Sequence, residues 1–214
     1  MEKGRLHRTQ EDLQVEKSWD WEGITVLRAA VTLPQFEGRR ARRLNRYYRR
    51  FAQSFLKYCE RELYPRAAAL CREKMAVSAP WSVSAAKLSY TITYENDTLL
   101  SLYADAAEEN LPPCQTLRRA DTWELSSALP LPLGELLGEG WKKALRKRIR
   151  DEARVRAESF YGDYRIRLRR FFSSRNFYLR EDGVCLFYQM RTLAPASEGI
   201  VEIFVPYEAL EPTI

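Results

Sequence analysis

The hydrophobic period of this chain changes from that of a helix to that of a strand, and this change constrains the fold most. From residue 44 to 59 the apolar side chains follow at spacings of four, three, four and four: Leu44, Tyr48, Phe51, Phe55 and Cys59. This spacing places them on one face of a helix. From residue 87 to 94 apolar residues alternate with Lys, Ser and Thr, as in an antiparallel strand with one buried face. The chain must therefore combine helices with a sheet.

Further helices and strands are predicted on both sides of these segments. Pro65 should interrupt the first helix, because its ring removes a donor and clashes with the preceding turn. The predicted helices cover residues 38–64, 66–75, 134–158 and 164–172, and the predicted strands cover 24–33, 87–94, 99–105, 121–125, 177–180, 184–190 and 200–205. Residues 106–115 are predicted to be a polar connection, and Gly183 to supply a positive φ in a tight turn.

This order of elements predicts an α+β fold. We expect one twisted, largely antiparallel sheet with two or three helices packed on it. The chain has 214 residues, of which 45% are hydrophobic, enough for one domain with a core. We expect a mobile N-terminal arm over residues 1–18 and a single domain over residues 19–214.

The N-terminal residues lack the apolar core of a signal peptide, and no apolar run reaches the roughly 20 residues of a transmembrane helix. Two interpretations stay open, a cytoplasmic chain and a chain without its export segment.

Histidine and cysteine usage argues against several chemistries. His7 is the only histidine and lies in the predicted arm, which argues against a hydrolase with a histidine base and against a histidine-rich zinc site. The four cysteines, Cys59, Cys71, Cys114 and Cys185, form no close pair of the kind that presents two thiolates to one metal ion. We predict mostly buried, reduced thiols, no metal site and no cofactor; a Cys59–Cys71 disulfide would need an oxidising compartment.

Two pairs of carboxylates are candidates for a glycosidase site, which needs two such groups flanking the scissile bond. Asp121 and Glu124 point to opposite faces of a strand, and Glu108 and Glu109 fall in the predicted polar connection. We predict that both pairs are solvated surface residues, and that the chain is not an enzyme.

Two basic clusters are the remaining candidate sites. They lie at the start of the first helix and along the helix of residues 134–158, and the candidate polyanion-binding residues are Arg39, Arg43, Arg46, Arg50, Lys143, Lys147 and Arg150. Like charges at i, i+4 cost roughly 0.2–0.5 kcal/mol per pair. The functional interpretation is phosphate binding by two faces that merge into one patch. The structural alternative is two solvated helix faces.

Residues 24–210 resemble a known family, and the last quarter of the chain carries the clearest part of the resemblance. The runs that carry the resemblance are N-F-Y-L at residues 176–179, A-P-A-S-E-G at 194–199 and F-V-P-Y-E-A-L at 204–210. They resemble the domain of unknown function at the C-terminus of RsiV-type lysozyme-responsive anti-sigma factors, which also accompanies some peptidoglycan deacetylases.

The resemblance implies a non-enzymatic recognition domain at the cell envelope. Its partner would be a protein, such as lysozyme, or a cell-wall-related ligand. The alternative interpretation is a cytoplasmic protein that binds nucleic acid or another polyanion through its two basic helices.

Overall fold

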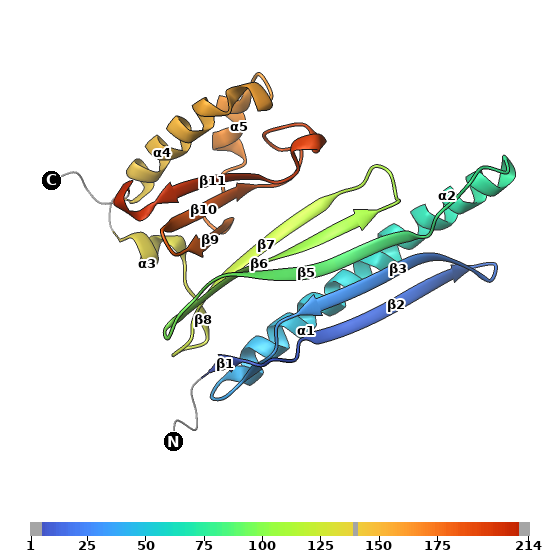
Figure 1. The fold of residues 1–214 in the computed structure, drawn as a ribbon, viewed down its shortest axis with the longest axis horizontal. Helices are drawn as coiled ribbons and strands as arrows, with labels where there is room; N and C mark the ends of the chain where they lie inside the picture. The colour runs from blue at the N-terminus through green and yellow to red at the C-terminus, as the bar shows by residue number, and fades with distance from the viewer. Residues whose placement is uncertain (1–5, 139–140, 210–214) are drawn as a thin grey trace. The chain divides into compact units, whose positions relative to one another are not determined.

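We analysed a computed structural model of the chain, which describes residues 6–138 and 141–209 (Figure 1). Residues 1–5 of the predicted arm, residues 139–140 within the predicted helix 134–158, and Leu210 of the family pattern lie outside the described residues. The chain is α+β with strands that pair largely in antiparallel fashion, which confirms the predicted fold class.

The described residues divide into two compact units. The first unit contains residues up to 90 together with 104–116, and the second contains residues 91–103 and 117 onwards. The hairpin of β5 (Ser84–Glu95) and β6 (Leu99–Glu109) contributes to both. Neither unit is therefore one continuous stretch of chain. The expectation of a single domain over residues 19–214 stays a prediction.

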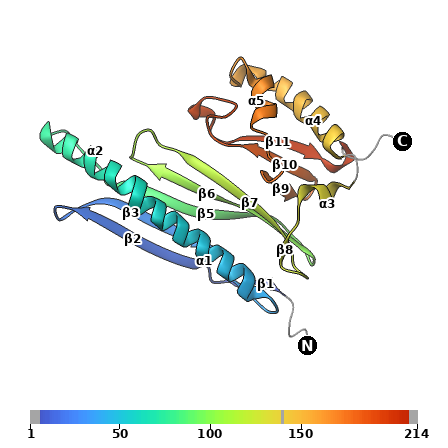
Figure 2. The ribbon, with the colours of Figure 1, turned by 180° about the vertical axis from the view of Figure 1, so that it is seen from behind.

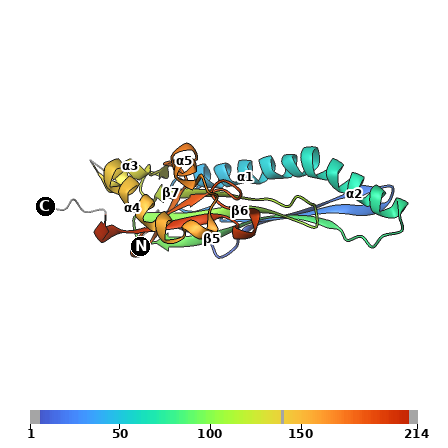
Figure 3. The same ribbon diagram turned by 90° about the horizontal axis from the view of Figure 1, so that it is seen from above.

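Long helices cross the strands of the first unit (Figures 2 and 3). Besides its parts of β5 and β6, this unit contains β1 (His7–Arg8), β2 (Leu13–Trp21), β3 (Ile24–Leu33), β4 (Phe36–Glu37), α1 (Ala41–Tyr58), η1 (Cys59–Leu63) and α2 (Tyr64–Ala76). β2 pairs with β3 in antiparallel fashion, whereas β3 pairs with β5 in parallel. A parallel pair needs a crossover connection, and the helical run from α1 to α2 supplies it.

The helical run passes Pro65 without breaking. The segment just before Pro65, η1, is a π-helix, and the N–H of Tyr64 bonds to the carbonyl of Cys59, five residues earlier. Proline at the second position of α2 would otherwise clash with the carbonyl four residues before it. At the predicted interruption before Pro65, the helical run therefore changes from an α-helix to a π-helix and back, and does not end.

The start of α1 is held by a side chain. The amide of Asn45 accepts from the N–H of Phe36 and donates to its carbonyl, both at 2.9 Å. β4 is thereby joined to the first turns of α1.

The predicted arm contains strands. Residues 13–18 lie in β2, which is paired with β3 from Leu13 to Trp21, and Trp19 is buried. Only alternate residues of β2 are partly covered, and Glu, Lys and Ser interrupt its pattern, so it has the weak period of an edge strand. The weak period explains why residues 13–18 are predicted as part of an arm, whereas in the structure they form a strand.

The described residues of the second unit form three helices, three short 3₁₀ turns and a three-stranded sheet. Besides parts of β5 and β6 it contains β7 (Thr116–Glu124), β8 (Leu129–Pro130), α3 (Leu133–Leu137), α4 (Trp141–Val155), η2 (Ala157–Ser159), α5 (Tyr164–Arg170), β9 (Phe177–Arg180), β10 (Gly183–Tyr188), η3 (Ala196–Glu198), β11 (Val201–Pro206) and η4 (Tyr207–Ala209). β10 lies between β9 and β11 and pairs with each in antiparallel fashion.

α4 packs on this sheet through the stripe that the sequence predicted (Figure 1). Leu145, Ile149 and Ala153 are buried in one core cluster with Leu186 and Ile203. The predicted helix 134–158 is two helices, because Gly138 adopts φ +70° at the end of α3.

Candidate functional site

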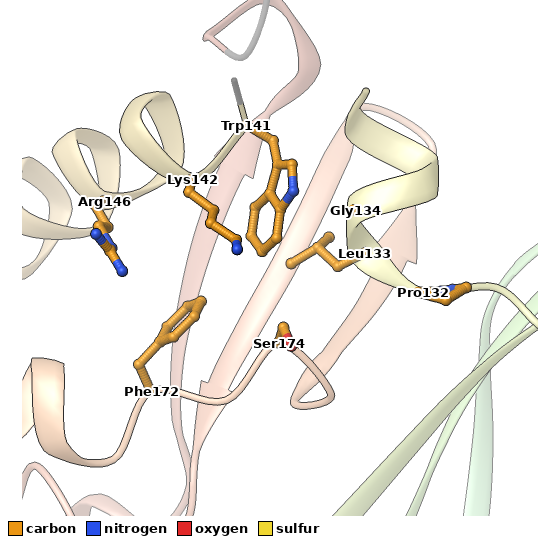
Figure 4. A pocket seen from close by; sticks show the side chains of 8 residues that line it. All are labelled: Pro132, Leu133, Gly134, Trp141, Lys142, Arg146, Phe172 and Ser174. Carbon is orange, nitrogen blue, oxygen red and sulfur yellow. The ribbon is translucent and has the colours of Figure 1, made fainter. Parts of the chain in front are cut away.

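The second unit contains a pocket where three of its segments meet (Figure 4). They are the start of α3, the first turns of α4 and the loop after α5. The cavity measures about 460 Å³, within the range of small-molecule sites, and is lined by Pro132, Leu133, Gly134, Trp141, Lys142, Arg146, Phe172 and Ser174.

The aromatic wall of the pocket is fixed by packing. Trp141 is the first residue of α4, and both Trp141 and Phe172 pack against the buried core of the second unit. A Cβ added to Gly134 would lie 3.0 Å from Nε1 of Trp141. Glycine at this position therefore lets the indole lie directly against the backbone of α3.

The polar side of the pocket is cationic. Lys142 and Arg146 lie one turn apart on α4, and both are exposed. Nζ of Lys142 lies 5.7 Å from the centroid of the Trp141 ring, within cation–π range. None of the eight lining residues is acidic. Two like charges at i, i+4 repel each other. An anion bound between Lys142 and Arg146 would be attracted by both and would offset this repulsion.

The lining offers several groups that can contact a ligand. It offers two ring faces, two cations and the hydroxyl of Ser174, and among these eight residues there is no carboxylate, imidazole or thiol. General acid–base catalysis most often uses such groups. An anionic group attached to a ring or another flat apolar body would match both sides of the pocket.

The candidate residues named from sequence are exposed but fall in different units. Arg43, Arg46 and Arg50 lie on α1 and Arg39 just before it, in the first unit, whereas Lys143, Lys147 and Arg150 lie on α4 in the second. The predicted merging of the two faces stays a prediction. Lys142 and Arg146 belong to the second basic face predicted from sequence but are not among the seven candidate residues, although their i, i+4 spacing beside Trp141 is visible in the sequence.

Glu108 corrects one expectation. It is only 8% exposed, because β6 continues to Glu109 instead of ending in a polar connection. Its Oε1 accepts a hydrogen bond from the Tyr58 hydroxyl at 2.7 Å, and Nη1 of Arg66 lies 3.5 Å from Oε2. The prediction of a solvated pair was wrong for Glu108. Glu109, on the other face of the strand, is exposed.

Burial and the neighbouring carboxylate together raise the pKa of Tyr58 to about 12. Arg66 also donates to the carbonyl of Leu111 at 3.1 Å. These contacts tie α1 and α2 to the end of β6 within the first unit, so we interpret the Glu108 cluster as structural. Of the other pair, Asp121 is partly buried and lies 3.6 Å from Nε of Arg119, and Glu124 is exposed.

The cysteine prediction is confirmed for three thiols. Cys59, Cys71 and Cys185 are buried, and Cys114 is partly exposed. Within residues 6–138 and 141–209, no group of three or more His, Cys, Asp and Glu side chains is placed to hold a metal ion. In the same residues, no helix combines the length and apolar character needed to cross a membrane.

Comparison with known proteins gives a family match for part of the chain. The family described as "Protein of unknown function (DUF3298)" matches residues 135–208. This segment includes five of the eight pocket residues, from Trp141 to Ser174. No match to a curated protein was found.

Two solved structures share the fold. The crystal structure of a DUF3298 family member from Bacteroides fragilis is 14% identical, with a TM-score of 0.61 over 98% of this chain and 93% of that chain. A DUF3298 family protein from Pseudomonas aeruginosa is 17% identical, with a TM-score of 0.58 over 97% of this chain and 94% of that chain. The predicted resemblance to a domain of unknown function is thus confirmed at the level of the family match and the fold. The RsiV and deacetylase setting and the lysozyme partner stay predictions.

Proposed function

We propose that this chain is a non-enzymatic recognition domain that binds an anionic ligand in the pocket of the second unit. The observation that carries the proposal is the composition of the lining. Two cations lie beside two aromatic rings, with no acidic residue among the eight that line the cavity.

The ligand is expected to carry a carboxylate next to a ring with an apolar face. Arg146 can hold a carboxylate in bidentate fashion, and Lys142 adds a second charge-assisted bond. The faces of Trp141 and Phe172 cover the apolar side of a sugar ring. An acidic sugar of the cell wall combines both features, which agrees with the cell-wall ligand that the family resemblance implies.

The proposal is tested by titration with two sugars that differ by one acidic group. N-acetylmuramic acid carries a lactyl carboxylate that N-acetylglucosamine lacks. Binding is followed through the indole N–H signal of Trp141 in ¹⁵N NMR spectra, assigned with the Trp141→Phe variant. We expect N-acetylmuramic acid to shift this signal and N-acetylglucosamine to bind at least about tenfold more weakly, because one charge-assisted contact is worth about 1.5–3 kcal/mol.

Two variants of α4 provide the matched comparison. Lys142→Gln/Arg146→Gln removes the pocket cations, whereas Lys143→Gln/Lys147→Gln removes two exposed cations of the same helix at the same spacing. The first variant should lose binding at least about tenfold, and the second should bind like the unmodified chain. Equal binding of both sugars, or equal loss in both variants, would contradict the proposal. Conversion of the bound sugar, detected by mass spectrometry, would contradict its non-enzymatic part.

A further inference from the structure

One helix of the first unit carries a row of basic residues and no acidic residue. α1 carries six basic residues and no acidic residue, and all six are exposed: Arg42, Arg43, Arg46, Arg49, Arg50 and Lys57. We call this set the α1 stripe. The chain as a whole has 35 Lys and Arg against 29 Asp and Glu, so without the α1 stripe the two signs balance at 29 each.

The α1 stripe occupies one side of the helix. An α-helix turns by about 100° per residue, which places all six within roughly a third of its circumference. The opposite side carries Leu44, Tyr48 and Phe55, which are buried. With a rise of 1.5 Å per residue, the stripe from Arg42 to Lys57 is about 22 Å long.

The charges of the α1 stripe oppose the stability of their own helix. Within the described residues, none of the six takes part in an ion pair. Arg42 and Arg46, and Arg46 and Arg50, are like charges at i, i+4. The first turn has no acidic residue, and Arg40 at the N-cap gives no side-chain cap, so nothing there offsets cations near the positive end of the macrodipole.

The basic face of α4 differs in this respect. Asp151 and Glu152 lie four residues after Lys147 and Arg148, a spacing at which opposite charges attract. α4 therefore carries part of its own compensation, whereas α1 has none.

We propose that the α1 stripe binds a linear phosphodiester polymer, independently of the pocket in the second unit. Five of its six cations are arginines, whose guanidinium groups bind phosphate in bidentate fashion. No aromatic or aliphatic side chain interrupts the stripe, whereas the core of a protein interface is usually built around such anchors. A nucleic-acid duplex presents one phosphate charge per 1.7 Å, or about 13 along 22 Å, enough to face every cation of the stripe.

The test measures binding of a fluorescein-labelled 20-base-pair DNA duplex by anisotropy over a series of salt concentrations. If about five phosphates are contacted, the logarithm of the association constant should fall with the logarithm of the salt concentration with a slope of about −4.5. The Arg42→Gln/Arg46→Gln/Arg50→Gln variant should bind at least about tenfold more weakly at low salt, with a slope nearer −2.

The matched control is Lys143→Gln/Lys147→Gln/Arg150→Gln, which removes the same number of exposed cations from α4. It should keep the affinity and the slope of the unmodified chain. Equal losses in both variants would show attraction by net charge alone and overturn the proposal. So would a failure of the unmodified chain to bind DNA at low salt, or displacement of DNA by an equal charge concentration of polyglutamate, which would indicate an acidic protein partner.

The melting temperature of the unliganded α1 variant provides a second measurement. Because the substitutions remove like-charge repulsion, it should not fall below that of the unmodified chain, and a clear decrease would contradict the argument. If the triple variant does not fold, the single variant Arg46→Gln serves, and its salt slope should be shallower by about 1. An unchanged slope would overturn the proposal.

Discussion

At the scale of single residues, Glu108 is the charged side chain whose environment matters most for stability. Its carboxylate is buried at the end of β6, accepts the hydrogen bond from Tyr58 and lies beside Arg66. A buried carboxylate is tolerated only when it is paired and hydrogen-bonded. Removing its charge should therefore cost more than removing the charge of its exposed neighbour.

We expect Glu108→Gln to lower the free energy of unfolding by about 1–3 kcal/mol, because Arg66 loses its ionic partner and the amide group turns a donor toward it. Glu109→Gln is the control and should change stability by less than about 0.5 kcal/mol. Urea unfolding measures both. Since Glu108 adds to the effect of burial on Tyr58, the pKa of that hydroxyl should also decrease in Glu108→Gln. Equal stability of the two variants would contradict this interpretation.

At the scale of elements, the β9–β10–β11 sheet shows why a glycine follows a turn. A positive φ is predicted for Gly183 from the sequence, but Gly183 is not among the residues with positive φ in the structure. Its Cβ would lie 2.4 Å from the carbonyl oxygen of Val205 and 2.8 Å from the ring of Phe204. Glycine is needed at residue 183 because β11 lies too close to leave room for a Cβ, and not because the turn requires a positive φ. The predicted positive φ of Gly183 was therefore wrong.

Gly183→Ala should therefore destabilise the protein by about 1–3 kcal/mol, the usual cost of forcing atoms into a packed site. Gly162→Ala is the matched control, because nothing lies within 4 Å of its added Cβ and its φ is not positive. Thermal unfolding of the two variants compares them directly. Similar melting temperatures would show that β11 moves away at little cost.

At the scale of the whole molecule, stability should depend on alkaline pH. Burial is the first cause of a raised pKa at Tyr58 and Tyr90, each to about 12, at Cys59, to about 12, and at Cys185, to about 11. In the unfolded chain these thiols and phenols lose their protons near their ordinary values of about 9 and 10. At pH values between the pKa values of the unfolded chain and those of the folded chain, the folded state binds more protons than the unfolded state. The free energy of unfolding therefore falls as pH rises.

We expect the free energy of unfolding to decline from about pH 9 to pH 12, measured by urea unfolding at each pH. Tyr90→Phe should make the decline shallower, because this variant lacks the phenol that donates to Asp12 at 2.5 Å. Stability that is flat or rising over this range would contradict the assignment of these groups as buried in their protonated forms.

Much of the fold could be predicted because its helices and strands follow from patterns among residues that are close together in the sequence. β3 was predicted at its exact bounds, since a run of apolar and β-branched residues ends at a proline. The stripe of α1 and that of α4 from Leu145 to Ala153 were predicted from helical spacing alone. The pocket was missed, because its lining comes from residues 132–134, 141–146 and 172–174, and no local pattern indicates that these three segments meet.

The class of fold, the helical and strand faces, and the row of basic residues on α1 follow from the sequence alone. These properties depend on residues close together in the chain, whose spacing sets which side of an element they share. The tertiary structure decided what each polar side chain faces. It buried Glu108 beside Tyr58 and Arg66 and placed Lys142 and Arg146 beside two aromatic rings. Such environments arise from contacts between residues distant in sequence, and those contacts decide whether a charge is solvated, paired or available to a ligand.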